Sequence, residues 1–125
     1  MVMETIYNPS RLKTQIEDAY KLMKDAKKRG CDALIIEDGT NIVLYDIAMD
    51  SLYIYDMSIE KLSVMDVVKR RTDMHKFCIY TKLDEGEFRL DEIAEFFVSP
   101  KTRQLEIELK ELYEPIEFNK NYRRR

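Results

Sequence analysis

The chain of 125 residues has no tryptophan and only one histidine, two cysteines, three glycines and three prolines. It contains no Gly-rich phosphate loop, no nucleophile elbow and no His-Glu-x-x-His metal motif. One histidine without a Cys-x-x-Cys spacing cannot build a zinc site, so we expect neither a metal nor a cofactor. No run approaches the roughly 20 apolar residues that span a bilayer, so a membrane partner is not expected either.

The two cysteines are Cys31 and Cys78. Residues 1–5 combine neither a basic start nor an apolar run, so we expect no signal peptide and a cytoplasmic protein. In that compartment the cysteines should be reduced thiols that behave as small hydrophobes, with a disulfide as the alternative. His75 should be an ordinary surface residue, because on a strand it and Cys78 would point to opposite faces.

Apolar residues make up 45% of the chain, which is enough for one modest core. We therefore predict a single domain over residues 1–118, followed by a basic, disordered tail over 119–125. The net charge of −3 is unevenly distributed. Without Arg123, Arg124 and Arg125, 18 basic residues remain against 24 acidic ones, so these three arginines carry +3 and the rest of the chain −6.

The first element is predicted to be a helix over residues 11–29. Ser10 is a suitable N-cap, and Gly30 stands where a left-handed C-terminal residue is favoured. The apolar residues between them fall on one helical stripe: Leu12, Ile16, Ala19, Met23 and Ala26.

Runs rich in β-branched and aromatic residues predict a β-meander over 33–37, 41–47 and 52–55. The first two runs flank Asp38-Gly39, a dipeptide that accepts the positive φ angles of a tight hairpin turn.

A second helix is predicted over residues 64–71. Ser63 and Asp66 resemble a capping box, although Ser58 is a competing cap that would start the helix near residue 59. A fourth strand should follow over 75–82. After a turn at 84–87, residues 88–90 should return beside it, before a short helix that carries Ile93, Phe96 and Phe97.

Residues 101–113 carry two conflicting patterns. Pro100 and Pro115 suit a helix start and stop, and Leu105, Leu109 and Leu112 have helical spacing. Residues 105–110 alternate strictly between apolar and charged, as a strand does, and the terminal charges oppose the helix dipole. We favour the helix and keep the strand as the alternative. The fold class is then α+β: a small antiparallel sheet, made of a β-meander plus a fourth strand, with the N-terminal helix packed on it and C-terminal helices.

The α-β-β-β-α-β order resembles that of restriction-type metal nucleases, and Glu17, Asp38 and Asp46 could supply carboxylates to magnesium. The resemblance implies a lysine on the third strand, but residues 52–56 read Leu-Tyr-Ile-Tyr-Asp and contain none. This departure makes a degenerate nuclease-like fold the weakest of three functional hypotheses.

A basic surface is the basis of a second hypothesis, nucleic-acid binding. The α-β-β-β-α order also resembles double-stranded-RNA-binding domains, whose lysine cluster begins the second helix, whereas Lys69-Arg70-Arg71 here ends it. Lysines share one face of the first helix with Glu17 and could join the other basic residues in contacting phosphates. The predicted nucleic-acid contacts are Lys13, Lys21, Lys24, Lys28, Lys69, Arg70 and Arg71, with the tail arginines. The alternative without a binding function is that these lysines simply form the solvent-exposed face of the helix.

An acidic segment and a group of tyrosines support the leading hypothesis, a small non-enzymatic binding or regulatory module of inhibitor type that acts on a protein partner. Acid residues crowd positions 84–95, and in charge and element order the chain is similar to some small acidic anti-CRISPR proteins. Tyr53 and Tyr55 face one side of the predicted sheet, and Tyr45 could join them. The predicted partner contacts are Asp84, Glu85, Glu87, Asp91, Glu92, Tyr53 and Tyr55. We expect later helices to cover the tyrosine face, and a homodimer through the sheet or the C-terminal helix is the next candidate.

Overall fold

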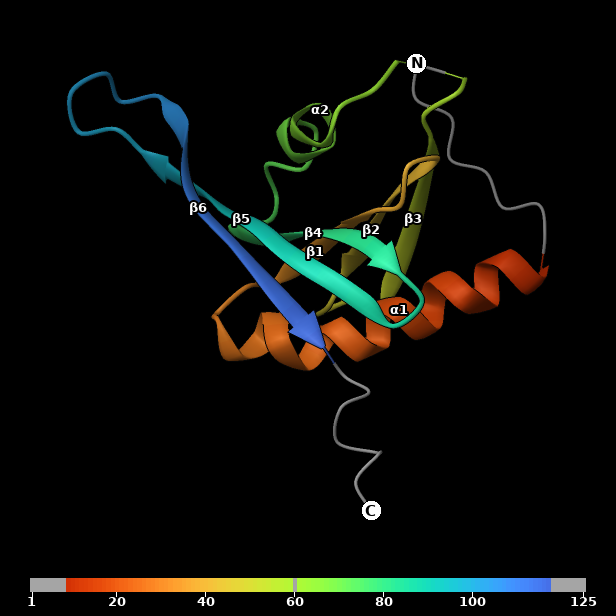
Figure 1. Ribbon diagram of the computed structural model, residues 1–125. Coiled ribbons are helices and arrows are strands. Elements are labelled where there is room, and N and C mark those ends of the chain that lie inside the picture. Colours follow the sequence, from red (N-terminus) through yellow and green to blue (C-terminus); the bar gives the residue numbers. More distant parts are fainter. Residues whose placement is uncertain (1–8, 60, 118–125) are drawn as a thin grey trace.

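The structure is a computed structural model of the chain, which describes residues 9–59 and 61–117. In these residues two helices and six strands follow one another: α1 Pro9–Lys28, β1 Ala33–Glu37, β2 Asn41–Asp46, β3 Ser51–Asp56, α2 Val64–Lys69, β4 Lys76–Asp84, β5 Glu87–Val98 and β6 Leu105–Glu117. The strands form one sheet in the order β3-β2-β1-β4-β5-β6, with α1 on one face and α2 on the other (Figure 1). The predicted α+β class is confirmed.

The sheet is mixed, so the prediction of a small antiparallel sheet is wrong. β1 pairs with β2 in antiparallel fashion but with β4 in parallel, from Ala33 opposite Phe77 to Glu37 opposite Thr81. The chain reaches β4 from β3 through α2, which crosses one face of the sheet. β1 and β4 are central strands covered on both faces, which explains why Ala33–Ile36 and Phe77–Tyr80 are apolar without alternation.

The predicted C-terminal helices are wrong as well, because both segments are strands. Ile93 packs on the α1 side of β5 and Phe96 on the α2 side, an alternation that a helix could not satisfy. For residues 101–113 the sequence favoured a helix and kept a strand as the alternative. The structure has a strand from residue 105, in agreement with the alternation at residues 105–110. Pro115 is tolerated within β6 because this is an edge strand, in which not every N–H has to donate a hydrogen bond to a neighbouring strand.

The first half of the chain follows the prediction closely. α1 begins at Pro9, so Ser10 lies in its first turn and not at the cap, and Gly30 after its end has a φ of 83°. Ser63 and Asp66 form the predicted capping box, so Ser58 is not the cap of α2. The tail beyond residue 117 lies outside the described residues.

Two buried clusters hold the layers together. One joins α1 to the sheet through Leu22, Leu34 and Tyr80, and the other joins α2 to the opposite face through Val67, Ile35 and Phe77. No helix in the described ranges is long and apolar enough to cross a membrane.

The prediction of two reduced thiols is wrong, because Cys31 and Cys78 form a disulfide. Cys31 directly follows Gly30 at the end of α1, and Cys78 lies on the face of β4 that α1 covers. Their Cα atoms are 6.1 Å apart, within the usual range for a disulfide. Helix and central strand are therefore cross-linked across 47 residues of sequence, a proximity that only the fold creates.

Candidate protein-interaction edge

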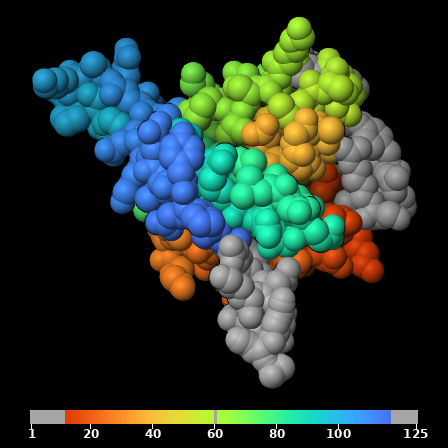
Figure 2. Space-filling model, viewed as in Figure 1, coloured from red at the N-terminus to blue at the C-terminus, as the bar shows by residue number. Residues whose placement is uncertain are grey.

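The hairpin of β5 and β6 extends beyond the rest of the sheet. Its loop, residues 99–104, stands clear of the body in the ribbon and the space-filling view (Figures 1 and 2). The Ser99 hydroxyl accepts the N–H groups of Lys101 and Thr102, and Arg103 adopts a φ of 61° to close the loop. Just inside the loop, Val98 and Leu105 are opposite each other and are 64% and 48% exposed. The hairpin end is thus an exposed apolar surface on a structured loop.

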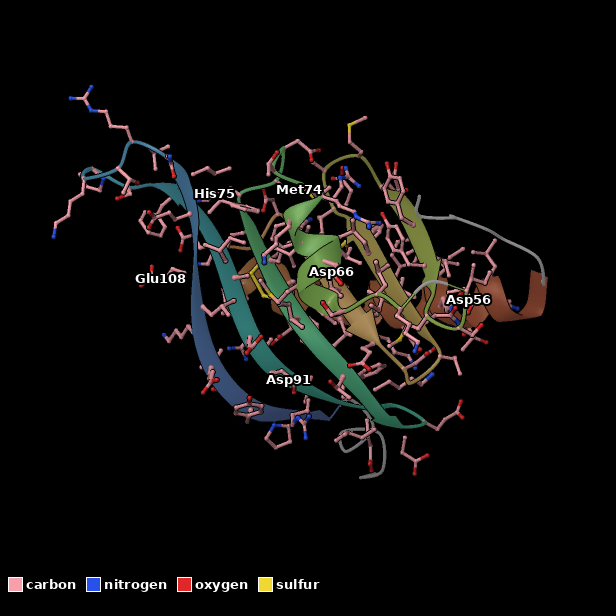
Figure 3. The ribbon with its side chains drawn as sticks, turned by 90° about the horizontal axis from the view of Figure 1, so that it is seen from above. Asp56, Asp66, Met74, His75, Asp91 and Glu108 are labelled. Atoms are coloured by element: carbon pink, nitrogen blue, oxygen red, sulfur yellow. A yellow bond between two sulfur atoms is a disulfide. The ribbon has the colours of Figure 1, made fainter. Side chains whose placement is uncertain are left out.

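β6 is the outer strand of the sheet and has thirteen residues. Along its first half, apolar and charged side chains alternate between the two faces. Leu105, Ile107 and Leu109 lie on the α2 side, and Ile107 is partly buried against the second core cluster. Glu106, Glu108 and Lys110 are exposed on the α1 side, and Figure 3 shows Glu108 on this outermost strand.

Two hydrogen bonds determine which peptide groups of β6 point away from the sheet. The N–H of Phe96 donates to the carbonyl of His75, so the Phe96 backbone is directed toward β4. Its neighbour in β6, Ile107, is therefore a position whose own N–H and C=O point outward. At the loop, the N–H of Ser99 donates to the carbonyl of Gln104, so the peptide groups of Gln104 point toward β5. Because this direction alternates along a strand, those of Leu105 and Ile107 point away from β5.

Accordingly, every second residue of the first half of β6 turns its peptide groups to the open edge: Leu105, Ile107, Leu109 and Glu111. An edge with free peptide groups can accept another strand.

The second half of β6 is protected from such pairing. The register shifts between Leu90 and Glu92 of β5, which face Glu114 and Glu111, so β6 carries an extra residue there. Tyr113, in this bulge, has a φ of 50°, and Pro115 follows without an N–H. Bulges and prolines are the usual means by which edge strands resist pairing. The open part of the edge is thus confined to about residues 105–111.

A chain of polar contacts anchors the protected half of β6 to the core. The Tyr80 hydroxyl donates to Asp25 Oδ2 at 2.6 Å, and Arg29 Nε donates to the same oxygen at 3.0 Å. Arg29 Nη2 then donates to Glu114 Oε1 at 3.0 Å. Burial and the neighbouring Asp25 carboxylate raise the pKa of Tyr80, so its hydroxyl stays protonated and donates. These contacts connect the protected half of β6 to α1 and β4.

Two hollows flank the hairpin. On the α1 side a groove of about 510 Å³ has a mostly charged lining that includes Arg29, Lys76, Glu95, Glu108 and Lys110. On the α2 side a pocket of about 290 Å³ lies between residues 72–75 and the hairpin, with a lining that includes Met74, Phe96, Val98 and Leu105. The edge thus separates a charged surface from an apolar one.

The predicted acidic patch is divided in two. Asp84, Glu85 and Glu87 are exposed at the β4–β5 turn. Asp91 is half-buried in a bulge of β5, where it accepts hydrogen bonds from Thr81 and Arg89. Glu92 is half-buried opposite Glu111; burial, Glu111 and Asp91 together raise its pKa above 4.5. Figure 3 places Asp91 and His75 toward opposite ends of the sheet.

The tyrosines do not form one face. Tyr53 and Tyr55 share the α2 side of β3, but Tyr45 lies on the α1 side, where its hydroxyl donates to Asp50. Tyr55 is 4% exposed and cannot contact a partner directly. The Arg71 guanidinium lies 4.7 Å from the centre of the Tyr53 ring. The face that we expected later helices to cover is covered by α2, the helix that follows β3 in the chain.

The predicted basic surface is also divided. The predicted contacts on α1, Lys13, Lys21, Lys24 and Lys28, are exposed on its outer side. Lys69, Arg70 and Arg71 lie at the end of α2 on the other face of the sheet. Arg71 is bound to Asp73 in addition to Tyr53. The tail arginines lie outside the described residues. One nucleic-acid strand following α1 would therefore not meet the α2 cluster.

The carboxylates of the nuclease hypothesis do not converge. Asp38 lies in the turn before β2, where it accepts the N–H groups of Thr40 and Asn41. Asp46 ends the same strand and accepts the N–H of Met49. A strand of that length separates them by about 17–20 Å, and Glu17 is exposed on α1. Among the described residues no cluster of three or more His, Cys, Asp or Glu could hold a metal ion.

Comparisons with protein-family models, with curated proteins and with solved structures give no match. The fold and the open edge define the class: an α+β domain whose described residues present an edge strand with one open side and a projecting hairpin. Sequence reasoning did not name β6 as a candidate site. The alternation at residues 105–110 indicated a strand, but the segment was predicted to be a helix, with the strand as the alternative.

Proposed function

We propose that the protein is a non-enzymatic binding module that joins a protein partner by adding a strand to the open half of the β6 edge. One observation carries the proposal: over residues 105–111 the outward peptide groups coincide with half-exposed apolar side chains. Strand addition takes its affinity from the peptide groups and its specificity from alternate side chains. The exposed Val98 and the pocket beside the hairpin would extend the contact on the α2 side.

The experiment uses Leu109, whose N–H points outward. Leu109→Pro removes that donor without removing a hydrogen bond to β5, whereas the control Leu109→Thr keeps the donor and introduces a β-branched side chain that suits a strand. Tagged versions of the wild type and of both variants serve as bait in affinity capture. We expect a partner to be retained by the wild type and the threonine variant and lost by the proline variant.

Equal urea midpoints of the three proteins would show that the fold is intact. A partner that binds all three alike would rule out strand addition at this edge.

Nucleic-acid binding by α1 is a second candidate, supported by one observation. Lys13, Lys21, Lys24 and Lys28 are all exposed along about 23 Å of one helix. This candidate predicts that the affinity for a fluorescent single strand falls steeply with salt, and that Lys21→Glu with Lys24→Glu weakens it at least tenfold. Binding that is absent at low salt would remove the candidate, as would binding that the double variant leaves unchanged.

The cytoplasmic location expected from the sequence stays a prediction. Structural disulfides such as Cys31–Cys78 are more common in oxidising compartments, so the redox state of this pair in the cell is the observation that bears on it.

A further inference from the structure

We infer that the partner at the β6 edge is a second copy of this chain, paired antiparallel about a two-fold axis through Leu109. This inference rests on the proposed use of the edge and identifies its occupant. A two-fold axis brings the same strand from both copies together, and the assembly closes as a dimer. The two sheets would then join into one continuous sheet with both hairpins at the seam.

The outward peptide groups allow this register. With Leu109 on the axis, Leu109 faces itself in the second copy, and Ile107 faces Glu111. All three positions direct their N–H and C=O to the open edge, so each facing pair can exchange two hydrogen bonds. The bulge at Tyr113 and the missing N–H of Pro115 then end the pairing on both sides of the axis.

Charge complementarity selects the same register. Centred on Leu109, Glu108 faces Lys110 of the second copy and Lys110 faces its Glu108. These pairs lie between the hydrogen-bonded ones, where opposite side chains come closest.

Every neighbouring register opposes like charges. An axis at Ile107 sets Glu106 against Glu108, and an axis at Glu108 or Lys110 sets that residue against itself. An axis at Glu111 opposes two Glu111 side chains and sets Glu108 against Glu114. Among axes from Ile107 to Glu111, only the one at Leu109 brings no like charges face to face.

The apolar side chains also match across this axis. On the α2 side, Leu109 is 44% exposed and Ile107 is half-buried. Two copies would place the two Leu109 side chains opposite each other, with each Ile107 diagonal to the second copy's Leu109 and directly opposite its Glu111; these apolar side chains continue the core under α2. Pairing thus covers the exposed Leu109 on one face while it joins opposite charges on the other.

Charge-swap variants test the register directly. In Glu108→Lys both facing pairs become Lys–Lys, and in Lys110→Glu both become Glu–Glu. A mixed dimer of the two variants restores two opposite pairs. Glu108 and Lys110 are exposed, so neither change should disturb the fold.

The measurement is sedimentation velocity over a range of concentrations, under non-reducing conditions that preserve the native disulfide. We expect the wild type to exceed the monomer mass of 15.0 kDa as concentration rises, toward twice that value. Each single variant should dimerise about tenfold more weakly or worse, and an equimolar mixture should recover wild-type association. A monomeric wild type, single variants that dimerise normally, or a mixture that does not associate would each overturn the inference.

Cross-linking gives an independent readout. Leu109→Cys places two thiols at the axis, where Cα atoms of a facing pair are about 5.5 Å apart and can be bridged. Oxidation should yield covalent dimers from this variant. It should yield none from Met49→Cys, which replaces a residue 72% exposed on a distant turn. Equal yields from both variants would overturn the inference.

The two proposals fail differently. A monomeric wild type that still captures another protein in a Leu109→Pro-sensitive manner overturns self-pairing and retains strand addition. Capture and self-association that are both unaffected by Leu109→Pro overturn the two together.

Discussion

At the scale of single residues, the bonds that run from Tyr80 through Asp25 and Arg29 to Glu114 connect three elements, β4, α1 and β6. Tyr80 is fully buried, and its hydroxyl is satisfied by a carboxylate that itself binds a guanidinium. Buried polar groups must be paired to be tolerated, so the Tyr80 hydroxyl depends on Asp25. The exposed Arg29–Glu114 bond extends this network of contacts to β6, which backbone pairing with β5 also holds in place.

Removing the Tyr80 hydroxyl should therefore be costly. Tyr80→Phe deletes a buried hydrogen bond to a charged group, and we expect a loss of about 2 kcal/mol in the free energy of unfolding. Urea denaturation measures it. Tyr20→Phe is the matched control, because the Tyr20 hydroxyl bonds Asp50 at the surface, and its cost should stay below about 0.5 kcal/mol. Equal losses in the two variants would contradict the network.

Glu92 gives a pH-dependent prediction. Its pKa is raised by burial first and then by Glu111 and Asp91, so the folded state resists its ionisation. As the pH rises above about 4.3, Glu92 ionises in the unfolded chain while it still holds its proton in the folded protein. Because the folded state then binds more protons, Glu92 lowers the free energy of unfolding as the pH rises. Glu92→Gln removes this effect.

We expect Glu92→Gln to melt at a higher temperature than the wild type at pH 7 and at the same temperature near pH 3.5. Thermal unfolding followed by circular dichroism at both pH values measures the difference. The control Glu85→Gln, at the exposed β4–β5 turn, should match the wild type throughout. A variant less stable than the wild type at pH 7 would refute the assignment.

At the scale of elements, α2 is short, and its start depends on one local motif. The Ser63 hydroxyl accepts the N–H of Asp66 at 3.1 Å, and the Asp66 carboxylate accepts the N–H of Ser63 at 2.8 Å. These bonds lower the pKa of Asp66. α2 buries Val67 and Val68 against the sheet, so its cap helps to hold the only helical cover on that face among the described residues.

Ser63→Ala should cost about 1 kcal/mol of unfolding free energy, because one bond of the capping box is lost. Chemical denaturation reports the value. Ser58→Ala serves as comparison: Ser58 bonds Asp56 in the turn after β3 and caps no helix, so its effect should be smaller. If Ser58→Ala cost more than Ser63→Ala, the capping assignment would be wrong.

At the scale of the whole molecule, the disulfide joins the end of α1 to the central strand across 47 residues. A cross-link of that span limits the unfolded chain and should add about 4 kcal/mol to the free energy of unfolding in the chain-entropy description. The link has little solvent access, since Cys31 is 5% exposed and Cys78 is fully buried.

We expect a reductant to lower the urea midpoint of the wild type markedly. It should leave the double variant Cys31→Ala with Cys78→Ala unaffected. Identical midpoints with and without reductant, after thiol titration has shown the bond to be broken, would mean that the cross-link contributes nothing.

The sequence predicted best where local rules act. The structure contains α1 with its apolar stripe and the glycine after its end. It also contains the meander with Asp38-Gly39 at its turn and the Ser63–Asp66 capping box. Each depends on residues a few positions apart. The candidate site was predicted poorly, because the surface is shared by elements distant in sequence: Tyr45 lies on the opposite face from Tyr53, and α1 and α2 hold their basic residues on opposite sides of the sheet.

By itself, the sequence determined the α+β class, the first helix and the first three strands, through side-chain periodicity and capping, which are properties of the local chain. Tertiary structure alone decided three things. β4 joined β1 in parallel because the chain crosses one face of the sheet through α2 before β4, and both strands had apolar residues to bury on two faces. Cys31 met Cys78 because α1 lies across β4. Residues 105–117 became an open edge because β5 offered them a partner strand, and pairing outweighed their helical spacing.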